Sequence, residues 1–341
     1  MKLEQSAETA TRQLTAYLKA HLVNSPPRFR EDVLYAIRLA SPLRERTYLV
    51  RIAAHMAGVA WSVVRPFAFA AELFMVSALT ADDAIDGADR RSGEPSLFKL
   101  KGSAHSFLVA EWLHAVANAC LTEKPSTVTE VRWREAAGEF RSAYSSLILN
   151  QYLESDEQNN PDVTLEQLDM LAEGRTGGLL TACLTAPAAL AGLRDLKKSL
   201  KETGKWLGIA FQHRDDILDL ISAPEVLGKP IMLDLFNGQP NIVLSHALTV
   251  STDRSAREIV LKYFGVGLSN KGIFEHGPDI QGDLLSALRK SGSLQYALEV
   301  VRDYCARARQ ALAHVPASPA REELYAFIDL VSYIEFPWEN R

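Results

Sequence analysis

The stretch Asp82-Asp83-Ala84-Ile85-Asp86 decides the predicted fold, because a near copy of it, Asp215-Asp216-Ile217-Leu218-Asp219, recurs later in the chain. On a helix, residues four apart lie on the same face, so the first and last aspartates of each stretch project together and the second lies beside them. Uncharged segments at 74–81 and 206–211 lead into the two stretches. This pattern predicts that both stretches end buried helices. We call Asp82, Asp83 and Asp86 the first acidic cluster, and Asp215, Asp216 and Asp219 the second acidic cluster.

Carboxylates at the ends of buried helices need cations, because neighbouring like charges that lose hydration stay ionised only when they are neutralised. Oxygen ligands favour Mg²⁺, which keeps several waters and is shared between one or two carboxylates and substrate phosphates. We therefore predict one divided catalytic site built from both clusters. A solvated helix end is the alternative for either cluster taken alone. The predicted metal ligands are Asp82, Asp86, Asp215 and Asp219.

Further motifs accompany the two clusters in a fixed order. The motifs are Arg91-Ser92-Gly93-Glu94-Pro95-Ser96 after the first cluster, Gln151 and Arg175-Thr176 between the clusters, Phe211-Gln212 before the second cluster, and Gly228-Lys229-Pro230 and Asp234-Leu235 after it. The eight histidines do not cluster, and we assign no direct role to His213, three residues before Asp216.

With these motifs, the chain resembles the trans-isoprenyl diphosphate synthases, the polyprenyl synthetase family. The resemblance implies an all-α isoprenoid synthase fold, a helical bundle around a central cavity. It implies an allylic prenyl diphosphate as substrate, three Mg²⁺ ions as cofactor and a homodimer. The substrate-binding residues that it implies are Arg46, Phe74, Ser77, Ala78, Arg91, Arg175, Thr176, Phe211, Gln212 and Lys229.

Three positions depart from the family pattern where the family binds its second substrate, isopentenyl diphosphate. The family's lysine, its histidine and the second arginine of its arginine pair fall on Leu43, Met75 and Ser92, whereas Arg44 is kept. A hydrogen bond to a charged group is worth about 1.5–3 kcal/mol, so the loss of the lysine and the arginine weakens binding by about two to four decades. A one-residue shift that makes Arg90-Arg91 the pair restores only the arginine.

Small residues precede the first acidic cluster, since Ala78 and Ser77 lie four and five positions before Asp82. In the family, aromatic residues at these positions limit the length of the prenyl chain. We therefore expect the cavity floor one helical turn deeper, near Phe74, and a substrate of about fifteen to twenty carbons.

Composition indicates a globular protein, with 47% hydrophobic and 23% charged residues in 341. A net charge of -5 gives no basis for nucleic-acid binding. The apolar stretches at 52–81 and 177–193 are interrupted by charged residues or by proline, so we expect no membrane span. The N-terminus carries no apolar leader segment, and we expect a cytoplasmic location. Helical periodicity without a linker or any alternating β run predicts a single all-α domain, residues 1–341.

Three functional hypotheses follow. The first is a terpene synthase-like enzyme, which ionises an allylic prenyl diphosphate and ends by cyclisation, rearrangement or water capture, because the second-substrate positions have changed. The second is a chain-elongating prenyl diphosphate synthase, which condenses isopentenyl diphosphate with an allylic diphosphate. The third is a non-catalytic partner subunit of a prenyl synthase, against which the completeness of both acidic clusters counts.

Overall fold

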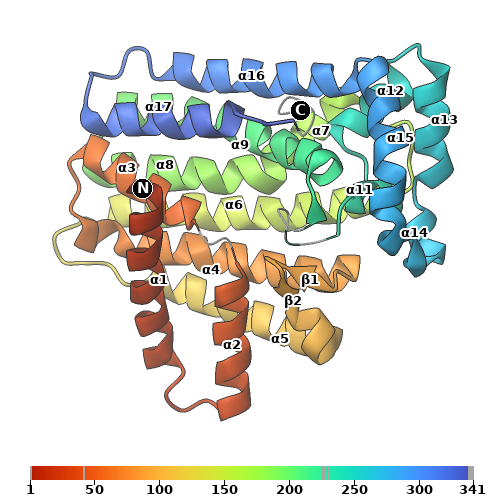
Figure 1. Ribbon diagram of the computed structural model, residues 1–341. Coiled ribbons are helices and arrows are strands. Elements are labelled where there is room, and N and C mark those ends of the chain that lie inside the picture. The colour runs from red at the N-terminus through yellow and green to blue at the C-terminus, as the bar shows by residue number, and fades with distance from the viewer. Residues whose placement is uncertain (1, 41–42, 225–227, 229, 337–341) are drawn as a thin grey trace. The chain divides into compact units, whose positions relative to one another are not determined.

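The protein is almost entirely helical, as the computed structural model in Figure 1 shows. The structure describes residues 2–40, 43–224, 228 and 230–336. The polypeptide forms two compact units, which are described separately. The first comprises Met1–Tyr144, Leu179–Lys201 and Val315–Leu324, and the second comprises Ser145–Gly178, Glu202–His314 and Tyr325–Arg341. The all-α class is confirmed, and a single domain over residues 1–341 stays a prediction.

The first unit is organised around α4 (Trp61–Asp86), which packs along α5 (Leu97–Cys120) and also contacts α2 (Pro27–Leu39) and α3 (Glu45–Ala57). A helix that is apolar on nearly all sides is expected to be buried. Among the described helices, α4 alone is long and apolar enough to cross a membrane, and 72% of its most apolar window is buried inside the protein, as in the core helix of a soluble fold. The unit also contains α1 (Lys2–His21), α8 (Gly178–Ala191) and the first parts of α6 (Glu130–Asp156) and α9 (Arg194–Ile221).

A short hairpin follows α4, formed by β1 (Arg90–Arg91) and β2 (Glu94–Pro95). Arg90 pairs with Pro95, and Arg91 pairs with Glu94, in antiparallel register. The turn residues Ser92 and Gly93 have φ angles of 51° and 81°, as a two-residue hairpin turn requires. The sequence shows no alternating β run, and yet these two short strands are present. Strands of two residues are specified by the conformation of the turn between them and not by alternation of hydrophobic residues.

The second unit is formed by the later part of the chain, in which α12 (Ile242–Thr249) packs against α13 (Arg254–Tyr263) and α16 (Ser293–Ala311). Thr164 caps α7 (Leu165–Ala172) through a capping box with Gln167. The remaining elements are the π-helix η1 (Glu173–Gly177), α11 (Leu233–Asn237), α14 (Val266–Ser269), the 3₁₀-helix η2 (Lys271–His276), α15 (Gly277–Lys290) and α17 (Pro319–Ser332), of which α17 begins in the first unit.

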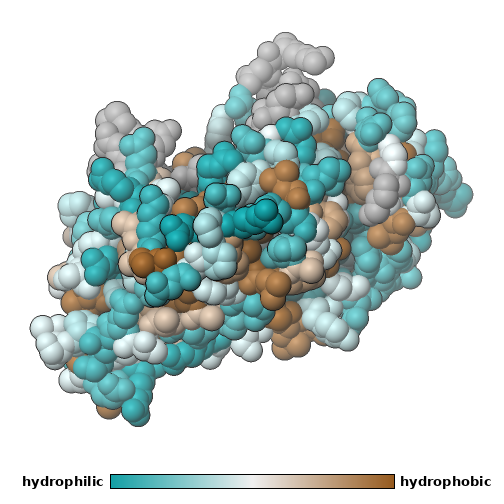
Figure 2. Space-filling view, turned by 90° about the horizontal axis from the view of Figure 1, so that it is seen from below, coloured by the Kyte–Doolittle hydropathy of each residue, from teal (hydrophilic) through white to brown (hydrophobic). Residues whose placement is uncertain are grey.

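The remaining features of burial concern the cysteines and the hydrophobic residues at the surface. All three cysteines are free and buried, as expected of core thiols. On the face drawn in Figure 2, hydrophobic residues lie in small separate patches among hydrophilic ones.

Candidate active site

The first acidic cluster lies in the last turn of α4, which ends at Gly87 in the left-handed conformation. Asp82 and Asp86 are half-buried and continue a half-buried stripe that includes Met75, Ala78 and Leu79. This spacing of three and four residues puts the stripe on one side of the helix. Asp82 and Asp86 are therefore the carboxylates of this cluster that remain accessible to a ligand.

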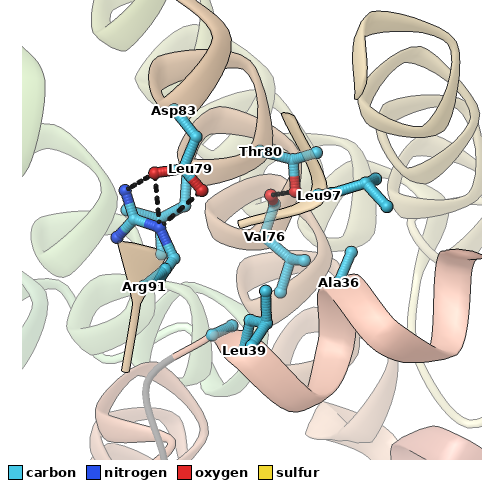
Figure 3. A pocket seen from close by; sticks show the side chains of 9 residues that line it. Ala36, Leu39, Val76, Leu79, Thr80, Asp83, Arg91 and Leu97 are labelled. Carbon is cyan, nitrogen blue, oxygen red and sulfur yellow. Dashed lines mark hydrogen bonds and ion pairs between the residues drawn. The ribbon is translucent and has the colours of Figure 1, made fainter. Parts of the chain in front are cut away.

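Asp83 instead faces the hairpin and holds Arg91. The Arg91 Nε donates to both carboxylate oxygens of Asp83 at 2.9 Å, and its Nη2 lies 2.7 Å from Asp83 Oδ1 and 3.8 Å from Asp82 Oδ2. Figure 3 shows this forked contact. Burial acts to lower the pKa of Arg91, but the bonds to Asp83 and the charges of the first acidic cluster raise it above its usual value. The guanidinium thus neutralises part of the cluster from within the first unit.

A small pocket lies beside this ion pair, between α2, α4, α5 and the hairpin (Figure 3). Its empty space amounts to about 220 Å³, open solvent included. Its lining is Ala36, Leu39, Ala40, Val76, Leu79, Thr80, Asp83, Arg91 and Leu97. We assign no substrate to this pocket. Its lining shows that Arg91 lies close to the end of α2.

Deeper along α4, three aromatic rings from three helices fill the space beside the small Ser77. Tyr144 of α6 stacks on Phe74 at 4.5 Å between ring centroids and on His114 of α5 at 4.6 Å. The Ser77 hydroxyl donates to the Ala110 carbonyl at 2.8 Å and lies 2.9 Å from the Tyr144 hydroxyl. Phe74 is completely buried, so the structure contains an aromatic wall at the depth where the sequence predicts the floor.

Arg44, which matches the family pattern, is a buried structural residue. It donates to the Ile37 carbonyl at 2.7 Å and to the Thr11 hydroxyl at 3.0 Å, and it lies 3.6 Å from Glu72. Arg46, a predicted substrate ligand, is 7% exposed and lies 3.6 Å from a carboxylate oxygen of Glu45.

The second acidic cluster lies near the end of α9 and has one exposed member. The side chain of Asp215 is 54% exposed, whereas those of Asp216 and Asp219 are buried. The two oxygens of Asp219 accept the backbone N–H groups of Leu233 and Asp234, both at 3.2 Å. Asp219 therefore fixes the chain around α11, and its role as a metal ligand stays a prediction.

Asp216 joins a chain of polar contacts that includes two predicted substrate residues. The Thr176 hydroxyl donates to Gln212 Oε1 at 2.8 Å, and Gln212 Nε2 donates to Asp216 Oδ1 at 3.1 Å. The backbone N–H of Ile242 donates to the other oxygen of Asp216 at 3.2 Å. Phe211, which precedes Gln212, is half-buried. The structure thus brings Thr176 and Gln212 to the second acidic cluster.

Thr176 and Arg175 lie in the π-helix η1, a conformation that is rare and frequent at functional sites. Arg175 is half-buried and forms an ion pair with Glu154 of α6. The backbone of η1 packs tightly against α9, because a Cβ placed on Gly208 would lie 2.1 Å from the Cα of Gly177. Glycine at 208 is what allows Thr176 to reach Gln212.

His213 forms a buried network that the sequence did not predict. Its Nε2 lies 2.7 Å from Asp169 Oδ1 and its Nδ1 lies 3.5 Å from Asp216 Oδ2, while the Tyr304 hydroxyl donates to the second oxygen of Asp169. Burial acts to lower the pKa of His213, but its bonds to the two carboxylates raise it to about 9. The one signal in the sequence was the position of His213 between Gln212 and the second acidic cluster. Nothing in the sequence indicates Tyr304 as a partner of Asp169.

The donor set fits a magnesium ion. Among the described residues, no three His, Cys, Asp or Glu side chains already converge on one point. Mg²⁺ needs only one or two carboxylates, because water and phosphate supply its other ligands. Asp82 and Asp86 in the first unit and Asp215 in the second offer accessible carboxylate oxygens. Lys229, a predicted substrate ligand, lies outside the described residues.

The helical fold thus carries two aspartate-rich helix ends, each beside basic or amide donors. A model of the family described as polyprenyl synthetase matches residues 39–271. The chain therefore belongs to the polyprenyl synthetase family.

Individual relatives agree with this assignment. The chain is 27% identical over 328 residues to the octaprenyl diphosphate synthase of Escherichia coli (strain K12), covering 95% of this chain and 96% of that one. It is 30% identical over 256 residues to the geranylgeranyl diphosphate synthase of Saccharolobus solfataricus, covering 74% and 73%. A solved geranylgeranyl pyrophosphate synthase from Corynebacterium glutamicum, complexed with isoprenyl diphosphate and magnesium, matches with a TM-score of 0.83 at 21% identity, covering 97% and 99%. The predicted isoprenoid synthase fold is confirmed, and the chain has the scaffold of a prenyl diphosphate synthase, an enzyme.

Proposed function

We propose that this protein is a chain-elongating prenyl diphosphate synthase, which condenses isopentenyl diphosphate with an allylic prenyl diphosphate. The observation that carries the proposal is the similarity over 95% of the chain to an octaprenyl diphosphate synthase. The proposal takes the second hypothesis from the sequence and ranks it above the terpene synthase-like one. The completeness of both acidic clusters supports it over a non-catalytic subunit.

Magnesium, when bound, would supply Lewis-acid neutralisation of the diphosphate that leaves the allylic substrate. We assign its binding to the accessible carboxylates Asp82, Asp86 and Asp215, with three ions as the expected number. Arg91 donates to the allylic diphosphate from its place beside Asp82, which is 3.8 Å away. Arg175, Lys229 and Gln212 are proposed as further diphosphate ligands, and Arg46 as a ligand of the second substrate.

The hydrocarbon chain is proposed to run along the stripe of α4 that begins at Asp82. Ala78, which is small and half-buried on this stripe, leaves room for it beneath the first acidic cluster. Apolar walls exclude water, which would otherwise quench an allylic carbocation. The stacked rings of Phe74 and Tyr144, at 4.5 Å, are where we place the end of the cavity.

A terpene synthase-like reaction is the second candidate, and the changed second-substrate positions favour it. Leu43 and Met75 carry no charge, and the Ser92 hydroxyl is engaged with the Leu39 carbonyl at 2.9 Å. Under this candidate the same ionisation ends in a hydrocarbon or an alcohol.

Product analysis with and without isopentenyl diphosphate separates the two candidates. Purified protein is incubated with Mg²⁺ and an allylic diphosphate of fifteen carbons, and the products are extracted before and after phosphatase treatment. A diphosphate five carbons longer, formed only when isopentenyl diphosphate is present, supports the proposal. Release of a hydrocarbon or alcohol that isopentenyl diphosphate neither accelerates nor lengthens supports the second candidate. Absence of turnover under every condition supports the partner subunit.

The homodimer is also proposed, and an exposed apolar stripe on α6 supports it. Its residues are Ile148, Leu149, Tyr152 and Leu153, which are 43–64% exposed and lie on one side of the helix. Exposed apolar surface of this kind marks association sites. Leu149→Glu with Leu153→Glu is expected to shift the protein to monomers in sedimentation analysis, and an unchanged dimer would place the interface elsewhere. The cytoplasmic location stays a prediction.

A further inference from the structure

The hairpin that carries Arg91 is fastened to α2 by two hydrogen bonds. The Tyr35 hydroxyl donates to the Pro95 carbonyl at 2.6 Å, and the Ser92 hydroxyl donates to the Leu39 carbonyl at 2.9 Å. One bond is made at strand β2 and the other at the turn, so together they hold both parts of the hairpin against the last two turns of α2. In Figure 3, Leu39 and Arg91 lie on adjoining sides of the small pocket at this junction.

Ser92 occupies a backbone conformation that serine rarely adopts. Its φ of 51° lies in the left-handed region, which favours glycine, asparagine and aspartate. A residue held in such a conformation is a reason to look for a function of its side chain. The contact with Leu39 is the function that the structure offers, because the hydroxyl of Ser92, itself an exposed residue, donates to the buried carbonyl end of α2 at 2.9 Å.

Other contacts of the hairpin with α2 contribute less. Arg38 of α2 lies 3.7 Å from Glu94, but their side chains are 59% and 52% exposed. Exposed ion pairs of this kind contribute little to stability. The Tyr35 and Ser92 hydroxyls thus supply hydrogen bonds between the hairpin and α2, and Arg91 joins the hairpin to Asp83 on α4.

We propose that Tyr35 and Ser92 form a latch that positions Arg91 on the first acidic cluster. The latch comprises the two hydroxyls and their acceptors, the Pro95 and Leu39 carbonyls. Both are positioning residues, since neither touches the reacting atoms. Ser92 thus replaces a phosphate-binding arginine of the family pattern with a structural fastening. The effect on the substrate rests on the proposed function, whereas the latch itself does not.

Limited proteolysis tests the latch without any substrate. Trypsin is expected to cleave after Arg90 and Arg91 faster when the hairpin leaves α2, so a rise in the initial cleavage rate there reports a larger population of the open hairpin. Tyr35→Phe and Ser92→Ala each delete one hydroxyl, and each is expected to raise this rate about five-fold, and both together about 30-fold. Ser92→Asn keeps a donor and tolerates the left-handed backbone, so it is expected to stay within about two-fold of the wild type. The matched control is Tyr333→Phe, which removes a hydroxyl from a tyrosine that is 63% exposed.

Kinetics test the link to Arg91. In the double variant Tyr35→Phe with Ser92→Ala, the KM for the allylic diphosphate is expected to rise about five- to ten-fold, while kcat changes less than about two-fold. Placing asparagine instead of alanine at position 92 is expected to bring the KM back toward the wild-type value. Equal cleavage of the wild type and the double variant would refute the latch. Faster cleavage with an unchanged KM would refute the positioning of Arg91. A wild type without turnover on any allylic diphosphate would overturn the proposed function, while the cleavage rates would still decide the latch.

The latch also predicts the outcome of restoring the family residue. Ser92→Arg deletes the hydroxyl and puts a bulky side chain at a positive φ. The rate of cleavage after Arg90 is expected to rise at least as much as in Ser92→Ala, and it is read at that bond because the introduced arginine is itself a new trypsin site. Slower cleavage than in Ser92→Ala would contradict the latch.

Discussion

Replacing Gly208 by alanine tests the contact on which the second half of the site depends. Gly208 is buried in α9 against the π-helix η1. A Cβ at this position would lie 2.1 Å from the Cα and 2.7 Å from the N of Gly177, and 3.3 Å from the carbonyl carbon of Thr176. All three atoms are backbone, so the added methyl group forces η1 and α9 apart.

The magnitude follows from two opposing terms. Alanine is favoured over glycine inside a helix by about 0.5–1 kcal/mol. Overpacking typically destabilises by about 1–3 kcal/mol, and contact with backbone on the far side puts this case at the upper end. Subtracting the first term from the upper end of the second, we expect Gly208→Ala to lower the free energy of unfolding by about 2 kcal/mol. It should also raise the KM for substrate, because Thr176 moves away from Gln212.

Urea denaturation of two variants measures this. The matched control is Gly282→Ala in α15 of the same unit, where a Cβ meets no atom within 4 Å. The control keeps the helix gain without the clash, so it is expected to raise the midpoint while Gly208→Ala lowers it. If both variants raised the midpoint equally, the close approach of η1 to α9 would be wrong.

Three further outcomes are expected. Asp215→Ala should abolish nearly all turnover but change the unfolding free energy by less than about 0.5 kcal/mol, because the Asp215 side chain is 54% exposed. Asp219→Ala should lower the unfolding free energy by about 2–4 kcal/mol, because it leaves two backbone N–H groups without acceptors. Equal denaturation midpoints for the two variants would contradict this division. The pKa of His213 is raised from 6.5 to about 9, so protonated His213 contributes up to about 3 kcal/mol to the unfolding free energy. This contribution is complete below pH 6.5 and is lost as the pH rises through 9. The unfolding free energy of the wild type should therefore fall over that window, and that of His213→Gln should change less. Tyr144→Ala removes a ring of the wall beside Ser77 and should lengthen the prenyl chain of the product or of the preferred substrate, as chromatography of the dephosphorylated alcohols would show; an unchanged length would mean that the chain runs elsewhere.

Much of the fold could be predicted from the sequence, because helical periodicity and apolar runs are local signals. The buried helix before the first acidic cluster, the capped start at Thr164 and the one-turn spacing of the aspartates all depend on neighbours within a few residues. Pro187 shows the limit of such signals, since it interrupts an apolar stretch in the sequence and yet lies inside the continuous helix α8. Packing on all sides keeps that helix continuous.

The division of work among the six aspartates could not be predicted, because it depends on partners far away in the sequence. Asp82 and Asp83 are adjacent and chemically identical, yet only Asp83 is buried beneath Arg91. The contact forms because the hairpin turns Arg91 back toward α4. The backbone groups that Asp219 binds are likewise 14 and 15 positions away.

The two clusters solve the same electrostatic problem in different ways. In the first, Asp83 is balanced by a guanidinium that itself remains close to Asp82, so one residue combines neutralisation with the proposed binding of diphosphate. In the second, Asp216 and Asp219 are balanced by backbone N–H groups, Gln212 and His213, and only Asp215 is left exposed. Because the first arrangement depends on a hairpin and the second on a helical scaffold, loosening the hairpin affects substrate affinity without unfolding the protein. Loosening the second arrangement affects both.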